Sequence, residues 1–326
     1  MVRTAHGRTA DARFATGHRT GLMYELPSIT DTIAVALAED LGVEASRFLA
    51  GAVPSPDVLT HDVTSSSVVG LDAQFSGVVV AREACTVCGL SVAAEVFEAL
   101  SRAAGIFEPV EFFPLVPEGA RVEPGCAVAE VDGLAAAVLC AERTALDFMM
   151  VLSGIATQTA RWVAAAGPAL AVCDTRKTLP GLRALSKYAV RVGGGTNHRD
   201  GLHDMVLVKD NHLARAGGVA QAVAQARAAH PDLVLEVEAD SLEQAREAVR
   251  AGADIVLLDN MDDEQLTRAV GVCREEASTH GRTVLTEASG TITLARLATL
   301  RHTGVDRVSA SALTLTGVID FGLDER

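Results

Sequence analysis

The sequence has few aromatic residues and no long apolar run. Aromatic side chains make up only 4% of the 326 residues, so aliphatic side chains must fill the interior, and a platform for stacking nucleic-acid bases is not expected. The formal net charge of −14 argues against nucleic acid or an anionic membrane as a partner. No apolar stretch reaches the length that spans a bilayer. These absences favour a folded cytoplasmic enzyme.

Metal-binding and targeting patterns are also lacking. Cys85 and Cys88 form a single CxxC, and no second CxxC or CxxH exists to complete four zinc ligands. Their surroundings are apolar and strand-like, which predicts two buried reduced thiols. Residues 1–23 carry four arginines but no apolar segment follows them, so they are predicted to form a disordered basic tail and not a secretory signal.

The rest of the chain divides into two patterns. Residues 24–140 combine helices with short strands separated by turns, which is typical of a small α+β domain. Residues 141–313 begin with a long helical run and continue with six apolar strand-like segments, most of them separated by amphipathic helices. Such alternation implies parallel strands with right-handed crossovers, so an α/β fold with an incomplete (β/α) barrel is expected. A doubly wound sheet is the alternative, and in either fold chemistry lies at the carboxyl ends of the strands.

Positive charge is concentrated in one segment. Residues 176–199 contain six lysines and arginines and no acidic residue, although the chain as a whole is strongly acidic. The chain has only three lysines, and Lys177, Lys187 and Lys209 all lie in or close to this segment. A cationic zone on an acidic protein is suited to small polyanions such as phosphates and carboxylates.

Acidic and hydroxyl residues mark the ends of several predicted strands. Glu236 and Glu238, Asp259 and Glu287 suit the hydroxyl groups of a sugar, or Mg²⁺ carried by a phosphate ester. The segment 289–291 is expected to follow a strand and open a helix, where free backbone N–H groups can hold phosphate, and 309–311 lies equivalently. Group transfer at a phosphorylated sugar therefore fits. Schiff-base aldolase chemistry on Lys209 also fits, but the cationic cluster exceeds what one phosphate needs.

Several motifs, taken in order, closely resemble those of the quinolinate phosphoribosyltransferase family. The resemblance extends from about Leu37 to the C-terminus. The motifs are AERTAL (141–146), LSGIAT (152–157), DTRKTLPGLR (174–183), KYAV (187–190), GGGTNHR (193–199), VKDNH (208–212), EVE (236–238) and LLDN (257–260).

The resemblance implies an N-terminal α+β open-faced sandwich domain, joined by residues 314–326, and a barrel domain that holds the catalytic site. It implies a homodimer with shared active sites and leaves a larger assembly open. The implied reaction joins quinolinate to phosphoribosyl pyrophosphate, giving nicotinate mononucleotide, pyrophosphate and CO₂ for NAD biosynthesis. Mg²⁺ is the implied metal, held directly or indirectly by Glu238 and Asp259, and no organic cofactor is needed.

The resemblance also assigns residues. The implied partners of the pyridine dicarboxylate are Arg143 (from the partner subunit), Arg176, His198, Arg199 and Lys209. The implied phosphoribosyl pyrophosphate site contains Lys177, Glu238, Asp259, Ser289, Gly290, Thr291 and Ser311. The implied catalytic groups are Lys177, Lys209, Glu238 and Asp259.

The chain departs from the family pattern near the expected 5′-phosphate site. Thr291 stands where the family usually has glycine, Ser311 also replaces a usual glycine, and Leu315 replaces a usual histidine. Asp147 stands where asparagine is usual. Two alternatives follow. The chain could be a paralogous phosphoribosyltransferase for another aromatic carboxylate, or a non-catalytic relative that binds an aromatic acid.

Overall fold

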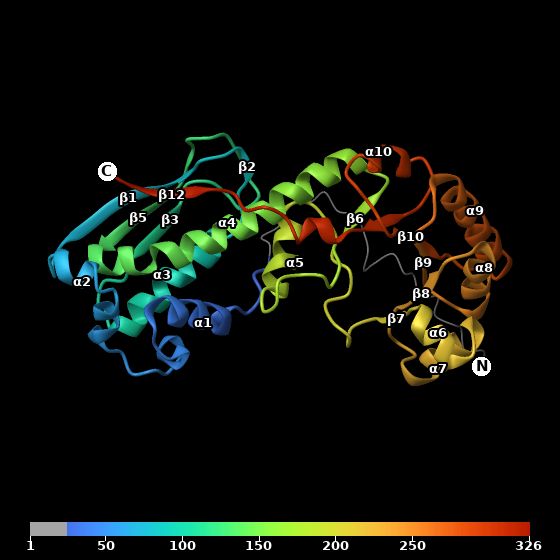
Figure 1. Cartoon of the computed structure of the whole chain (residues 1–326), viewed down its shortest axis with the longest axis horizontal. Coiled ribbons are helices and arrows are strands. Elements are labelled where there is room, and N and C mark those ends of the chain that lie inside the picture. Colours follow the sequence, from blue (N-terminus) through green and yellow to red (C-terminus); the bar gives the residue numbers. More distant parts are fainter. Residues whose placement is uncertain (1–24) are drawn as a thin grey trace, which may run out of the picture. The chain divides into compact units, whose positions relative to one another are not determined.

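The structure is a computed structural model that describes residues 25–326, so the predicted basic tail lies outside the described residues. The chain forms two compact units, drawn in Figure 1. The sandwich unit comprises residues 25–160, 178–194 and 313–326, and the barrel unit comprises 161–177 and 195–312. One long helix, α4 (Ala135–Ala166), begins in the sandwich unit and ends in the barrel unit.

The sandwich unit is built on a four-stranded antiparallel sheet with the order β12-β1-β5-β3. The rings of Phe97 on α3 and Phe112 on β3 stack with centroids 5.8 Å apart, which places α3 against the sheet. A sheet with helical cover of this kind is the predicted open-faced sandwich. The elements of this unit other than α4 are α1 (Thr30–Leu41), η2 (Ala45–Phe48), η3 (Pro56–His61), α2 (Ser65–Val68), β1 (Gln74–Ala81), β2 (Cys85–Thr86), α3 (Leu90–Ala104), β3 (Glu111–Pro114), β4 (Arg121–Val122), β5 (Ala127–Leu134), α5 (Arg183–Val192) and β12 (Phe321–Glu325).

The barrel unit contains six strands, all parallel, in the order β6-β11-β10-β9-β8-β7. The strands from β7 to β11 are neighbours in chain order, and the first strand, β6, pairs with the last. That is the circular order of a barrel, whereas a doubly wound sheet reverses its order at a switch point. In this sheet β6 and β7 are its two edges, so the barrel is incomplete, as predicted. The strands are β6 (Ala171–Cys173), β7 (Val206–Val208), β8 (Leu235–Ala239), β9 (Ile255–Asp259), β10 (Leu285–Ser289) and β11 (Arg307–Ser309).

Helices connect successive strands and bury the outer face of the sheet. The strands β7 and β9 are mainly apolar, as is typical of strands covered on both faces, whereas β8, β10 and β11 also carry charged residues. The amphipathic helices expected between the strands are present, for example at Val219–Ala229 and Leu242–Ala251. The helices are α6 (Asp210–Ala216), α7 (Val219–Ala229), α8 (Leu242–Ala251), α9 (Asp263–Thr279), α10 (Leu297–Leu300) and the single turn η4 (Ser311–Leu313). None of the described helices is long and apolar enough to cross a membrane.

One local prediction is wrong. Residues 289–291 do not open a helix, because β10 ends at Ser289 and α10 begins only at Leu297. Gly290 and Thr291 have φ angles of 83° and 44°, and a right-handed helix cannot contain positive φ. Any phosphate held here would therefore meet loop backbone and side chains, without a helix dipole behind them.

Two glycines in helices differ in the space around their Cα atoms. A Cβ on Gly154, within α4, would overlap the carbonyl oxygen of Gly317, whereas Gly271 on the exposed side of α9 has no atom close to an added Cβ. We expect Gly154→Ala to destabilise the fold by about 1–3 kcal/mol through overpacking. Gly271→Ala should stabilise it by about 0.5–1 kcal/mol, because alanine loses less backbone entropy in a helix. Denaturant unfolding of both variants checks this, and equal effects would contradict the packing argument.

Candidate active site

The predicted catalytic residues of the barrel unit lie at one edge of its sheet. Arg176 and Lys177 follow β6, Lys209 follows β7, and Glu238 and Asp259 lie at the ends of β8 and β9. Because the strands are parallel, these carboxyl ends share one edge. The predicted phosphate residues follow at the same edge, as Ser289 to Thr291 after β10 and Ser311 after β11.

Arg143 lies elsewhere. It is on α4 in the sandwich unit, where its guanidinium is 3.4 Å from the carboxylate of Asp147 in an i,i+4 pair. Both side chains are more than half exposed, so this pair does little to hold the arginine in place.

A buried carboxylate holds the cationic segment against the sheet. Asp174 is fully buried just after β6 and accepts hydrogen bonds from the backbone N–H of His198 at 2.9 Å and from the amide of Asn197 at 2.5 Å. Next to these hydrogen bonds, Cys173 and Thr196 form an isolated parallel β-bridge between their backbones. The residues before and after the 178–194 excursion are thereby joined, which brings Arg176 and Arg199 into one neighbourhood.

The two arginines lie close enough to affect each other electrostatically. Burial and the positive charge of Arg176 both lower the pKa of Arg199. The Nε atom of Arg176 is buried and has no hydrogen-bond partner among the described residues. Two neighbouring guanidinium groups, one with an unsatisfied donor, provide a binding position for an anion with planar carboxylates.

Next to the cationic group lies an acidic one. The Lys209 ammonium is 2.7 Å from Oε2 of Glu238, and Asp259 follows on the adjacent strand. Burial, then the charge of Glu238, raises the pKa of Asp259, while the ammonium of Lys209 lowers it. The amide of Asn260 donates to Asp259 at 2.7 Å. The carboxylates offer the oxygen ligands that Mg²⁺ prefers, and a cation would relieve their mutual repulsion.

Beneath this edge, four charged side chains form a buried ionic network. Nε2 of His198 is 3.0 Å from Glu236 and 3.5 Å from Glu287. Arg307, on β11, places Nε 2.5 Å from Glu287 and Nη2 3.5 Å from Glu236. The side chains of all four are at most 7% exposed. We call His198, Glu236, Glu287 and Arg307 the ionic layer.

Proton positions in the ionic layer follow from its charges. Burial lowers the pKa of His198, but hydrogen bonds and charges of Glu236 and Glu287 outweigh it and raise this pKa to about 9. The backbone N–H of Arg199, 2.7 Å from Nδ1, opposes that rise because it needs the lone pair of the neutral ring. Burial also opposes ionisation of Glu287, yet Arg307 and His198 lower its pKa to about 2. For Glu236, burial and the charge of Glu287 raise the pKa.

The ionic layer resembles a metal site in its ligand set. His198, Glu236 and Glu287 place one ligand atom each within 4.8 Å of one another. However, the guanidinium of Arg307 already lies against both carboxylates and supplies the positive charge that a metal ion would bring. We therefore interpret the layer as an ion-pair network. Both ring nitrogens of His198 have protein partners here, so a direct contact with substrate requires one of them to be exchanged.

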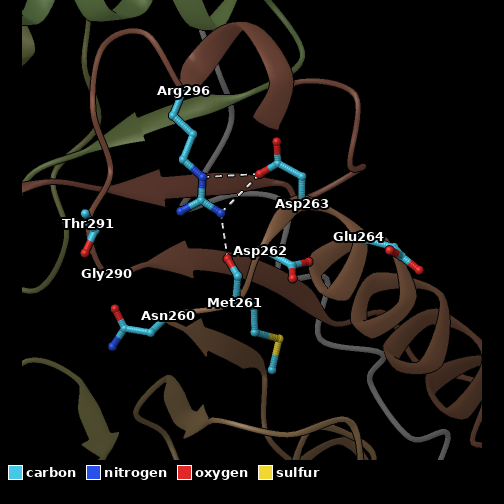
Figure 2. Close-up of a pocket in the computed structure, with 8 residues that line it drawn as sticks. All are labelled: Asn260, Met261, Asp262, Asp263, Glu264, Gly290, Thr291 and Arg296. Carbon is cyan, nitrogen blue, oxygen red and sulfur yellow. Dashed lines mark hydrogen bonds and ion pairs between the residues drawn. The ribbon is translucent and has the colours of Figure 1, made fainter.

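The described residues also form a pocket of about 570 Å³ beside the β9 and β10 ends (Figure 2). Gly290 and Thr291 line it, together with the start of α9. Figure 2 shows Arg296 directed at Asp263, 3.1 Å away, and at the carbonyl oxygen of Met261. The side chain of Arg296 therefore links the segment between β10 and α10 to the segment between β9 and α9. The pocket is lined by Asn260, Met261, Asp262, Asp263, Glu264, Gly290, Thr291 and Arg296.

Sequence reasoning missed two important residues. Asp174 was noted only within a motif, because nothing in the sequence reveals that its carboxylate accepts from Asn197 and His198. The rule that chemistry lies at the carboxyl ends of strands does not select Arg307, because Arg307 is the first residue of β11. Its direct neighbour in the sheet register is Glu287, and such pairing across strands is not visible in one sequence.

Comparisons with known proteins show which family the chain resembles. The family model "Quinolinate phosphoribosyl transferase, C-terminal domain" matches residues 155–324, and the model of the N-terminal domain matches 62–153. The carboxylating nicotinate-nucleotide pyrophosphorylase of Mycobacterium leprae is 39% identical over 302 residues, covering 92% of this chain and 98% of that protein. The nicotinate-nucleotide pyrophosphorylase structure from Francisella tularensis has a TM-score of 0.78 and 32% identity, covering 94% of this chain and all of that one.

The ionic layer makes stability depend on pH in a definite direction. The pKa of His198 is raised from 6.5 to about 9 on folding, so its contribution is complete below about pH 6.5 and is lost as the pH rises through about 9. We expect the free energy of unfolding to decrease across this window. Urea unfolding between pH 6 and 10 measures it. The decrease should be smaller in His198→Gln, and the exposed His203→Gln is the matched control. An equal decrease in all three proteins would exclude His198 as its source.

Proposed function

The chain belongs to the quinolinate phosphoribosyltransferase family, and we propose that it converts quinolinate and phosphoribosyl pyrophosphate into nicotinate mononucleotide, pyrophosphate and CO₂ for NAD biosynthesis. The observation that carries this proposal is the closeness of Arg176 and Arg199 at the carboxyl edge of the barrel. A second positive group, Lys209, lies at the same edge, next to the carboxylates of Glu238 and Asp259. One side of the site thus suits a dicarboxylate and the other a ribose.

On the acid side, the two guanidinium groups supply most of the orientation. Each can form a bidentate pair with a carboxylate, which fixes a planar pyridine dicarboxylate in position and rotation. The unsatisfied Nε of Arg176 supports this role. We propose Arg176, Arg199 and Lys209 as direct partners and His198 as part of the same pocket. Arg143 would reach the site from the partner subunit of a homodimer.

On the ribose side, Lys177, Glu238 and Asp259 would face phosphoribosyl pyrophosphate. Glu238 and Asp259 have the oxygen ligands and like charge that fit Mg²⁺, bound directly or through water. When bound with the diphosphate, Mg²⁺ would neutralise charge on the leaving group. The 5′-phosphate would meet residues 289–291 and Ser311, where Thr291 adds a side chain to a loop that usually has glycine.

The reaction needs charge stabilisation at two points. As the C–O bond to pyrophosphate breaks, positive charge grows at the anomeric carbon, and the nearby carboxylates stabilise it. The pyridine nitrogen then forms the new C–N bond, while the ammonium of Lys177 stabilises the departing pyrophosphate. The resulting pyridinium accepts the electron pair when the C–C bond to the 2-carboxylate breaks, releasing CO₂, and a proton from solvent takes its place on the ring.

One assay tests this function. Purified protein with quinolinate, phosphoribosyl pyrophosphate and Mg²⁺ should form nicotinate mononucleotide and release CO₂, whereas omission of any one component should abolish product. Quinolinate binding without turnover would instead indicate a non-catalytic acid-binding relative. Neither binding nor turnover would indicate a different aromatic carboxylate as substrate. The cytoplasmic location and the dimer with shared sites stay predictions.

The arginines can be tested separately from catalysis. We expect Arg176→Ala and Arg199→Ala each to weaken quinolinate binding by at least about 100-fold, because each removes a charge-assisted pair from a partly desolvated site. Calorimetry with quinolinate measures this. Arg215→Ala, which removes an exposed arginine from the last turn of α6, is the control and should bind normally. Normal affinity in either test variant would remove that arginine from the acid site.

Thr291 offers a test of the phosphate side. A β-branched residue at φ 44° is strained, at a cost of about 1–2 kcal/mol that glycine avoids, although glycine loses more entropy on folding. We expect Thr291→Gly to raise the melting temperature slightly and to tighten phosphoribosyl pyrophosphate binding, because the side chain crowds the loop. Thr291→Ala keeps the strained Cβ and loses only the hydroxyl and methyl groups. Weaker binding in both variants would show that the hydroxyl helps to bind the phosphate.

A further inference from the structure

A continuous series of short contacts leads from Arg307 to the acid side of the site. Arg307 contacts Glu287 at 2.5 Å and Glu236 at 3.5 Å, and both carboxylates contact Nε2 of His198. The opposite nitrogen of that ring, Nδ1, accepts the backbone N–H of Arg199 at 2.7 Å. Side chains from β8 and β10 thus contact His198, the residue that precedes Arg199, and Arg307 on β11 contacts both of these side chains.

The charges in this series cannot be removed one at a time without consequence. Glu236 and Glu287 are both fully buried, so two carboxylates face each other in a medium where unpaired charge is very unfavourable. Arg307 is the one cation of the ionic layer whose charge does not depend on pH. Without it, only His198 could supply positive charge to both carboxylates. A fully protonated ring has no lone pair on Nδ1, so it would lose the hydrogen bond from the Arg199 backbone N–H.

We propose that Arg307 is a positioning residue for acid binding: by neutralising Glu236 and Glu287 at the centre of the barrel, it fixes the ring of His198 and, through it, the direction in which Arg199 points. This inference rests on the proposed function, because it takes Arg199 as a partner of the substrate carboxylates. Arg307 itself is 3% exposed, so its proposed role is to act through His198 and not by contact with the substrate.

A purely structural role would give a different result, and the chain provides a matched comparison. Arg227 is also an arginine paired with a carboxylate in the barrel unit: it lies 2.6 Å from Asp254 and donates to the carbonyl oxygens of Leu233 and Gly252 at 2.9 Å. Asp254 precedes β9 and Leu233 precedes β8, so this cluster stabilises the amino ends of the strands, opposite the site. Loss of Arg227 should lower stability and leave substrate binding unchanged.

The experiment compares Arg307→Met, Arg307→Lys and Arg227→Met with the wild-type chain. Thermal unfolding, the Kd for quinolinate and the KM for phosphoribosyl pyrophosphate at saturating quinolinate are measured for each. We expect Arg307→Met to weaken quinolinate binding by about 10- to 100-fold, the range typical for groups that orient a directly binding side chain. The KM for phosphoribosyl pyrophosphate should change less than about twofold. Arg307→Lys should recover part of the affinity, because it keeps the charge but loses the planar fork.

A double variant separates charge balance from folding. Arg307→Met with Glu287→Gln removes one positive and one negative charge together, so it should fold better and bind quinolinate more tightly than Arg307→Met alone. If Arg307→Met does not fold, the Kd for quinolinate of Arg307→Lys and of the double variant still tests the proposal. Wild-type affinity in folded Arg307 variants, with only the melting temperature lowered as in Arg227→Met, would overturn the proposal alone. A wild-type chain that does not bind quinolinate would overturn the proposed function, and this inference with it.

Discussion

The buried ion pair between Arg307 and Glu287 is the interaction on which the site depends. The interior of a parallel barrel is usually filled by layers of aliphatic side chains. Here the layer beneath the catalytic edge consists instead of two carboxylates, a guanidinium and an imidazole. Such groups contribute little net stability, because their desolvation offsets most of their attraction. These groups instead fix the positions of the four side chains, since any displacement leaves a buried charge without its partner.

That arrangement divides the edge of the barrel by charge. The strands β6 and β7 are followed by cations, whereas β8 and β9 end in carboxylates, and Lys209 forms an ion pair with Glu238 between the two sides. A ligand with two carboxylates and a ligand with developing positive charge on a sugar need opposite surroundings. The order of strands in the barrel places the cationic and the acidic surroundings next to each other. Arg176 and Arg199 remain close together, and the pKa of Arg199 is lowered as a result.

Much of this fold could be predicted from the sequence, because short apolar segments recur along the barrel unit and the helices that connect them are amphipathic. The site residues at strand ends could be predicted by the rule that chemistry lies there, and the motifs around Arg176 and Lys209 made the assignment specific. Glu236 and Glu287 were expected among acidic strand ends, but they lie three and two residues before the last residue of their strands and are fully buried. Their partner Arg307 and the anchor Asp174 depend on register and on contacts between distant segments, which composition and spacing do not encode. The helix expected after Ser289 failed for a local reason, because Thr291 has positive φ.

The excursion of residues 178–194 out of the barrel unit has a consequence for how this chain can vary. Its two ends are joined where Asp174 accepts from Asn197 and His198, so the barrel unit holds a closed loop whose tip lies in the other unit. The entropy of closing such a loop grows only with the logarithm of its length. Within the barrel unit, the closure and not the length of the excursion therefore fixes the spacing of Arg176 and Arg199. The length of the excursion is restricted instead by the sandwich unit, where α5 buries Leu185 and Tyr188.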